Sequence, residues 1–185
     1  MNSNLFPTCI SSWIPFLLIG CFSMSACASQ MNKSTESLPV VQDFELQRYL
    51  GTWYEIARLP HRFEKNLQRV TATYALREDG RISVLNRGYD TVRKKWKDAQ
   101  GRAWIPDSQQ PAILKVSFFL WFAADYRIIL LDENYHYAMV TSSTKNYFWL
   151  LSRKPVMDAE SYDQLIQQAA DFGFDIDRII KVKQP

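Results

Sequence analysis

Cysteine is scarce in this sequence, and Cys9, Cys21 and Cys27 all lie within the first 27 residues. The rest of the chain therefore has no disulfide and no thiol chemistry. Histidine is rarer still, because only His61 and His136 are present, and neither is placed by the sequence beside a nucleophile. No spacing typical of a metal site occurs. We therefore predict a protein that is not an enzyme and that has no metal and no cofactor.

Charged side chains are absent from residues 1–26. The apolar run from Trp13 to Phe22 is too short and too interrupted to span a bilayer as an ordinary helix, and it is typical of a secretory signal. A polar stretch without apolar periodicity follows it. We predict a lipoprotein signal peptide over residues 1–26, a flexible tether over 27–42 and one globular domain over 43–185.

The end of this signal resembles that of bacterial lipoproteins, in which a small residue precedes a cysteine that becomes acylated. Residues 18–21 and residues 24–27 both fit this pattern. Cleavage before Cys21 would leave Phe22 beside the lipid and a second free cysteine, so we favour Cys27, with Cys21 as the alternative. Two or more acyl chains anchor a protein stably to a membrane. A plain cleaved signal that releases a soluble protein is the other interpretation.

Charge of one sign is also not in excess, because 22 Lys and Arg face 19 Asp and Glu. This balance gives no footprint for nucleic acid. The densest basic run, residues 93–97, fits a solvated hairpin or a weak contact with anionic lipid headgroups. Aromatic residues, in contrast, make up 14% of the chain and offer much apolar area to a core or a ligand.

Short runs of strand-forming residues recur from Trp53 onward, separated by turns such as Asp79-Gly80. Gly101 interrupts the fourth run, where we expect a bend or bulge. The eight expected strands cover residues 53–58, 70–76, 81–89, 94–105, 112–119, 126–131, 135–142 and 147–152.

A helix follows the strands, with Asp158 as its expected N-cap and Gly173 as its stop, and a short strand at 179–182 ends the chain. Eight antiparallel strands joined by short turns predict an all-β fold with one flanking helix. Such a sheet avoids exposed edges by closing into an up-and-down barrel, whose interior can hold one small ligand.

Alternation along the strands sorts side chains into two faces. Leu114, Val116 and Phe118 share a face that must point inward, because Lys115 takes the opposite one. The other residues that alternation groups on shared faces are Ala72 with Tyr74, Val84 with Asn86, Arg127 with Ile129 and Leu131, Ala138 with Val140, and Tyr147 with Trp149. This set suits an elongated apolar molecule with a polar end, with Arg127 available to a carboxylate or phosphate, although alternation equally allows a filled core.

An apolar stretch, residues 118–124, stands where a polar turn is expected between two strands. Exposed apolar loops usually mark a contact with a membrane, a ligand or a partner. We expect a hydrophobic rim at the barrel mouth that touches lipid or a second subunit; a loop folded back over the barrel end is the alternative.

These residues resemble the lipocalin family over about residues 41–183. The first signature of that family, Gly-x-Trp at the start of the first strand, is present as Gly51-Thr52-Trp53, and its third signature, an Arg that closes the last barrel strand, is present as Arg153. The second signature, usually Thr-Asp-Tyr, is poorly matched at residues 131–135.

The resemblance implies an eight-stranded calyx in which Trp53 closes one end and Arg153 packs across it. For the bacterial branch it implies binding of fatty acid or lysophospholipid, and storage or movement of lipid during envelope stress. The implied location is the outer membrane, with the domain facing the periplasm. The ligand-facing positions it implies are Ala57, Ala72, Tyr74, Val84, Asn86, Leu114, Val116, Phe118, Arg127, Val140, Tyr147 and Trp149. A structural or partner-binding envelope lipoprotein with a filled barrel is the alternative function, and a homodimer is one assembly that it could form.

Overall fold

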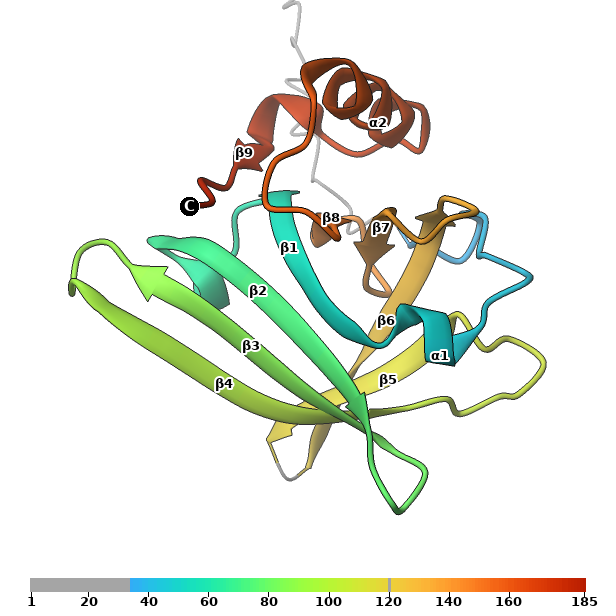
Figure 1. Ribbon diagram of the computed structural model, residues 1–185. Helices are drawn as coiled ribbons and strands as arrows, with labels where there is room; N and C mark the ends of the chain where they lie inside the picture. The colour runs from blue at the N-terminus through green and yellow to red at the C-terminus, as the bar shows by residue number, and fades with distance from the viewer. Residues whose placement is uncertain (1–33, 120) are drawn as a thin grey trace, which may run out of the picture.

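Strand β1 (Gly51–Arg58) is hydrogen-bonded to β2 on one side and to β8 on the other, and this double pairing closes the sheet (Figure 1). The computed structural model describes residues 34–119 and 121–185. Neighbouring strands run antiparallel in the order β2-β3-β4-β5-β6-β7-β8-β1-β9, with the additional β2–β1 pairing. The remaining barrel strands are β2 (Leu67–Leu76), β3 (Ile82–Asp90), β4 (Lys95–Trp104), β5 (Ile113–Phe119), β6 (Phe122–Leu131), β7 (Tyr137–Thr141) and β8 (Phe148–Ser152).

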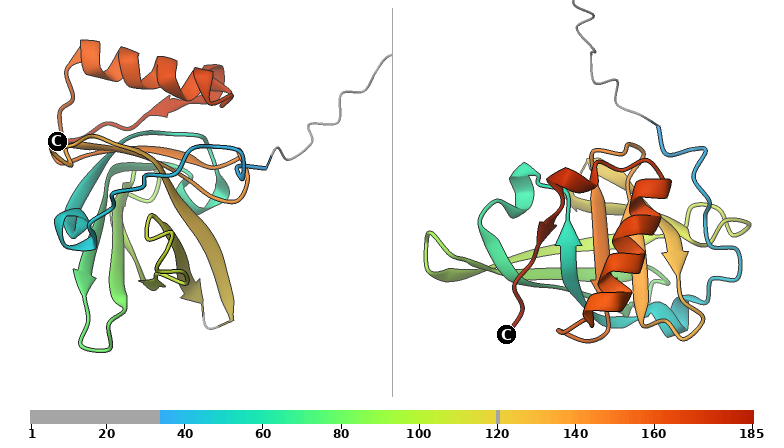
Figure 2. Two further views of the ribbon diagram at one scale, coloured as in Figure 1. Left: turned by 90° about the vertical axis from the view of Figure 1, so that its right-hand side faces the viewer. Right: turned by 90° about the horizontal axis from the view of Figure 1, so that it is seen from above.

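Helix α2 (Ala159–Asp171) lies outside the barrel, over β7 and β8 (Figure 2). Its N-cap is Asp158, whose carboxylate accepts a hydrogen bond from the Ser161 amide at 2.8 Å, as the sequence predicts. The short strand β9 (Ile180–Lys181) pairs with β1 at Ala57 and Arg58, beyond the point where β2 leaves it. Two short 3-10 helices, η1 (Arg62–Glu64) and η2 (Ile176–Arg178), and helix α1 (Leu46–Tyr49) complete the described elements.

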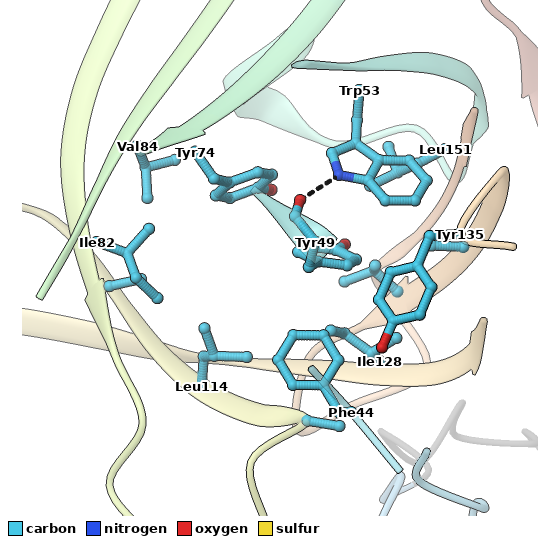
Figure 3. Packing of buried hydrophobic residues seen from close by; sticks show 14 residues of the cluster. Phe44, Tyr49, Trp53, Tyr74, Ile82, Val84, Leu114, Ile128, Tyr135 and Leu151 are labelled. Carbon is cyan, nitrogen blue, oxygen red and sulfur yellow. Dashed lines mark hydrogen bonds between the residues drawn. The ribbon is translucent and has the colours of Figure 1, made fainter. Parts of the chain in front are cut away.

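Two large apolar cores and one small cluster of Leu67, Val70 and Val182 result from this arrangement. One fills the closed half of the barrel, and its members point toward one another from opposite walls (Figure 3). The second core lies between the outer wall and α2, and includes Phe148, Leu150 and Ala169. Among the residues that the structure describes, no helix is both long enough and apolar enough to span a bilayer.

The closed end is built around Trp53, which is fully buried. Its indole Nε1 donates to the carbonyl of Tyr49 at 2.8 Å, and the Arg153 guanidinium lies 4.0 Å from the ring centroid. Arg153 also donates to the carbonyls of Arg48 and Thr52. Gly51 enters the strand at a φ of 95°, which a residue with a Cβ rarely adopts. Trp53, Tyr49 and Arg153 thus form the base of the barrel, with a cation–π contact between Arg153 and Trp53.

Residues 34–42 lie against the barrel, although the sequence places them in a flexible tether. Thr35 is fully buried and its amide donates to the carbonyl of Ser143, while Leu38 packs into the core beneath α2. The packed part of the chain thus begins by Ser34 instead of Asp43. The proposed signal peptide and the candidate lipid sites Cys21 and Cys27 lie outside the described residues.

Gly101 does not form a bulge, which is one of the two features that the sequence led us to expect there. The β3–β4 pairing runs without a register shift through Val84↔Gly101, so β4 is continuous. A Cβ at Gly101 would instead lie 2.8 Å from the ring of Phe118 and 2.8 Å from the carbonyl oxygen of Ser117. The glycine is needed because the next strand approaches closely there.

Trp53→Ala should lower the free energy of unfolding by roughly 3–5 kcal/mol, because a large buried side chain is lost. Trp121→Ala is the matched control: Trp121 is 96% exposed, so its loss should change stability by less than about 0.5 kcal/mol. Urea unfolding followed by far-UV circular dichroism measures both. Equal effects of the two substitutions would contradict the closed-end account.

Candidate functional site

A cavity of about 140 Å³ lies inside the barrel, above the base formed by Trp53. Most of its wall is apolar and comes from β2, β3, β5, β7 and β8. Eight of the twelve predicted ligand-facing residues line it, namely Ala72, Tyr74, Val84, Asn86, Val116, Phe118, Val140 and Trp149. The barrel is therefore hollow at the level of these residues, where sequence alternation alone allowed either a cavity or a filled core.

Arg127 is on the outer face of β6, so its predicted place in the cavity is wrong. Ala124 and Tyr126 line the cavity, and Tyr126 pairs across the strands with the interior residue Leu114. A bulge between Ile128 and Leu130 then shifts the alternation. The interior position of Leu131 is consequently no guide to the face of Arg127.

A second bulge displaces Ala57 from the cavity. The pairing of β1 with β8 shifts between Glu55 and Ala57. Glu55 therefore lines the cavity, whereas Ala57 is fully buried in the core beneath α2. The two other predicted residues, Leu114 and Tyr147, are not in the cavity wall: Leu114 packs in the closed-end core and Tyr147 lies at the mouth.

Three tyrosine hydroxyls meet at the inner end of the cavity. The Tyr74 hydroxyl donates to that of Tyr126 at 2.9 Å, and the hydroxyls of Tyr126 and Tyr49 are 2.6 Å apart. Burial raises the pKa of Tyr74, so its hydroxyl stays protonated. Nearby, Asn86 Oδ1 is buried and has no hydrogen-bond partner in the described part of the chain. The inner end of the cavity thus combines apolar walls with a few uncharged polar atoms.

An acidic cluster that the sequence analysis missed forms another part of the wall. Glu55 and Glu64 both line the cavity, and Arg58 lies between them, fully buried. Arg58 Nη1 donates to Glu55 Oε1 at 2.6 Å, and Arg58 Nε lies 3.5 Å from Glu64 Oε2. Arg58 also donates to the carbonyls of Glu64 and Leu67, so the cluster fastens the loop over residues 59–66 to β1.

The pKa values of the two carboxyls of this cluster shift in opposite directions. Burial raises the pKa of Glu55 well above its usual value, and the charge of Glu64 acts in the same direction against the attraction of Arg58. Burial also disfavours ionisation of Glu64. Its contact with His61, the hydrogen bond from Glu55 and the charge of Arg58 outweigh that effect and lower the pKa of Glu64. These two directions favour protonation of Glu55 before Glu64, while both carboxyls stay beside Arg58.

Aromatic rings narrow the mouth of the cavity. The ring of His61 lies 5.3 Å from that of Trp149 and 5.6 Å from that of Tyr147, which are stacked on each other. The cavity volume of about 140 Å³ is below the roughly 300 Å³ that is typical of the smaller ligand pockets. A complete acyl chain would therefore displace these rings. A larger hollow, of about 520 Å³, lies outside the barrel, but four acidic residues border it, so it suits an apolar ligand less well.

Glu55→Gln and Glu64→Gln should affect the stability of the protein in different ways. Wild-type stability should fall as the pH rises above about 4.5, because the unfolded chain releases a proton that folded Glu55 retains. Glu55→Gln should remove this fall. Glu64→Gln should cost roughly 3–5 kcal/mol at neutral pH, because it removes the more readily ionised of the two carboxyls that balance buried Arg58. Urea unfolding at pH 5 and pH 8 measures the stability of both variants. A larger loss of stability at neutral pH in Glu55→Gln than in Glu64→Gln would contradict these pKa directions.

Known proteins are similar to this chain in sequence and in fold. The sequence model of the Lipocalin-like domain matches residues 44–184. Outer membrane lipoprotein Blc of Vibrio cholerae is 46% identical over 169 residues, which cover 91% of this chain and 93% of that protein. Blc of Escherichia coli K12 is 40% identical over 182 residues, 98% of each chain. Insecticyanin from the tobacco hornworm Manduca sexta shares the fold with a TM-score of 0.63 at 19% identity, over 80% of this chain and 85% of that one.

The match therefore covers the whole barrel and the helix outside it. Lipocalins bind or transport small hydrophobic molecules and are not enzymes. The hollow barrel, its apolar wall and the Trp53–Arg153 base agree with that class of binding protein. This chain belongs to the lipocalin family.

Proposed function

We propose that this protein binds the acyl chain of a fatty acid or lysophospholipid inside its barrel. The observation that carries the proposal is the enclosed apolar cavity of about 140 Å³ directly above a sealed base. Binding in such a site follows the apolar area removed from water, at about 25 cal/mol per Å² before the costs of association. The aromatic rings at the mouth move apart to admit the rest of the chain.

The charges around the cavity support an orientation for the ligand. Among the described residues, its wall contains the carboxyls of Glu55, Glu64 and Asp125 and no Lys or Arg. Exposed Arg62 and Lys65, in contrast, lie on the loop beside the mouth. A carboxylate or phosphate is repelled by the wall and attracted to the mouth, so the acyl chain enters first and the headgroup stays outside. The mouth cations thus take the role that the sequence assigned to Arg127.

The cellular setting follows from the relatives, which are named outer membrane lipoproteins. We propose that acylated Cys27 anchors this protein to the outer membrane with the domain in the periplasm, where it stores or moves lipid when the envelope is stressed. The alternative is a structural or partner-binding lipoprotein that is occupied by its own side chains and associates as a homodimer. The exposed Phe119, Trp121 and Phe122 favour that alternative, because they offer an apolar contact surface.

Titration with a fluorescent fatty acid, competed by lysophospholipid, should give saturable binding at one site. Ala72→Trp fills the cavity and should weaken binding at least about tenfold, because each methylene kept out of the barrel costs about 0.8 kcal/mol. Arg127→Ala, on the outer face, should bind like the wild type. Thermal unfolding verifies that both variants fold, and Val84→Trp replaces Ala72→Trp if that variant does not. Absence of saturable binding by the wild type would contradict the proposal.

A further inference from the structure

We propose that the open end of the barrel is a docking surface for an anionic lipid bilayer. This inference rests on the proposed function, since it supplies the route by which a lipid reaches the cavity. Three independent features of the same end carry it: exposed aromatic side chains, an excess of positive charge, and the point at which the N-terminal chain leaves the domain.

The strand directions define this end. Strand β1 begins at the base, with Trp53, and runs toward the mouth, where His61 follows it. Because neighbouring strands are antiparallel, the connections after β1, β3, β5 and β7 all lie at the mouth. The connections after β2, β4 and β6 lie at the base. Among the described residues, the open end is therefore formed by 59–66, 90–97, 119, 121–122 and 142–147.

Exposed apolar side chains gather at this end. Nine large hydrophobic residues are exposed in the described part of the chain, and six belong to these stretches. The most exposed is Trp121, at 96%, between Phe119 and Phe122 at the tip of the β5–β6 hairpin. The other three are Phe63, Val92 and Trp96. Aromatic side chains favour the boundary between headgroups and acyl chains.

Positive charge is concentrated at the same end. The four stretches that form it contain seven Lys and Arg and two acidic residues. Neither acid faces the solvent freely: Glu64 belongs to the buried cluster, and Asp90 is buried and accepts from the amides of Val92 and Arg93. At the base, the stretches 43–50, 77–81, 105–112, 132–136 and 153–158 contain five Lys and Arg and eight acidic residues. An anionic surface therefore attracts the mouth and repels the base.

The N-terminal chain leaves the domain at the mouth as well. Ser34 forms a bridge with Thr144, and the Thr35 hydroxyl donates to the carbonyl of Ser142, in the connection between β7 and β8. If Cys27 is acylated, six residues lie between it and Ser34. The seven steps from Cys27 to Ser34 span at most about 25 Å when extended. The anchor thus holds the mouth close to the membrane that contains it.

A bilayer fits this surface better than a second copy of the chain does. Two mouths placed face to face would bring Arg62, Lys65 and the basic run at residues 93–97 against their own copies, and like charges at an interface oppose association. Anionic headgroups neutralise the same residues at about 1 kcal/mol for each Lys or Arg. The hydrophobic tip at Trp121 then enters the bilayer between them.

Site-specific labelling of the mature lipoprotein, reconstituted in vesicles, tests the proposal. An environment-sensitive fluorophore is attached to Trp121→Cys at the mouth and, as the matched control, to Asp79→Cys at the base. In vesicles of phosphatidylglycerol and phosphatidylethanolamine, the label at position 121 should shift to the blue and resist dithionite, whereas the label at position 79 should do neither. Lys94→Gln and Lys95→Gln should each reduce the ratio of docked to free protein about fivefold.

Three outcomes overturn the proposal. Equal exposure of both labels shows that the mouth does not meet the bilayer. Protection at position 121 that persists in neutral vesicles at about 1 M salt, where charges are screened beyond roughly 3 Å, excludes an anionic surface. Protection accompanied by quenching between two labels at position 121 identifies a second copy of the chain as the occupant. Fatty-acid titration of the same variants is independent, so failed docking is distinguished from failed lipid binding.

Discussion

The pairing of β1 with both β2 and β8 is the constraint on which the rest of this structure depends. It turns an open sheet into a barrel and removes the edges that an open sheet would expose. It also places Trp53 at the base, where Tyr49 and Arg153 hold it from two sides. Without this closure, the Tyr74 and Val84 walls would face water and there would be no enclosed cavity. Closure of the barrel therefore depends on β1, and the ligand that it can hold depends on the other strands.

Sequence patterns predicted the closed barrel better than the residues that line its cavity. Gly51, Trp53 and Arg153 have local roles that a short motif determines, and the strands followed from alternation and turns. Arg127 and Ala57 were misplaced because each lies beside a bulge, which changes the face of every residue beyond it. Glu55 and Glu64 were missed because a carboxylate in a strand or loop normally indicates a solvated position. Only the tertiary contact with buried Arg58 makes their burial favourable.

Charge is arranged along the barrel axis in a way that suits tail-first entry of a lipid. The cavity wall carries the acidic residues Glu55, Glu64 and Asp125, the mouth is basic and the base is acidic. Glu55 and Glu64, through Arg58, fix the loop that carries His61 across the entrance. Selectivity for the acyl chain, orientation of the headgroup and control of the entrance thus depend on adjacent residues of one strand and one loop.

Native mass spectrometry of the protein purified from membranes tests most directly whether the barrel is a lipid container. The account predicts a monomer that carries one non-covalent lipid, released on collisional activation as a fatty acid or lysophospholipid. An empty protein that associates as a dimer would contradict it and would favour a partner-binding lipoprotein with a filled barrel.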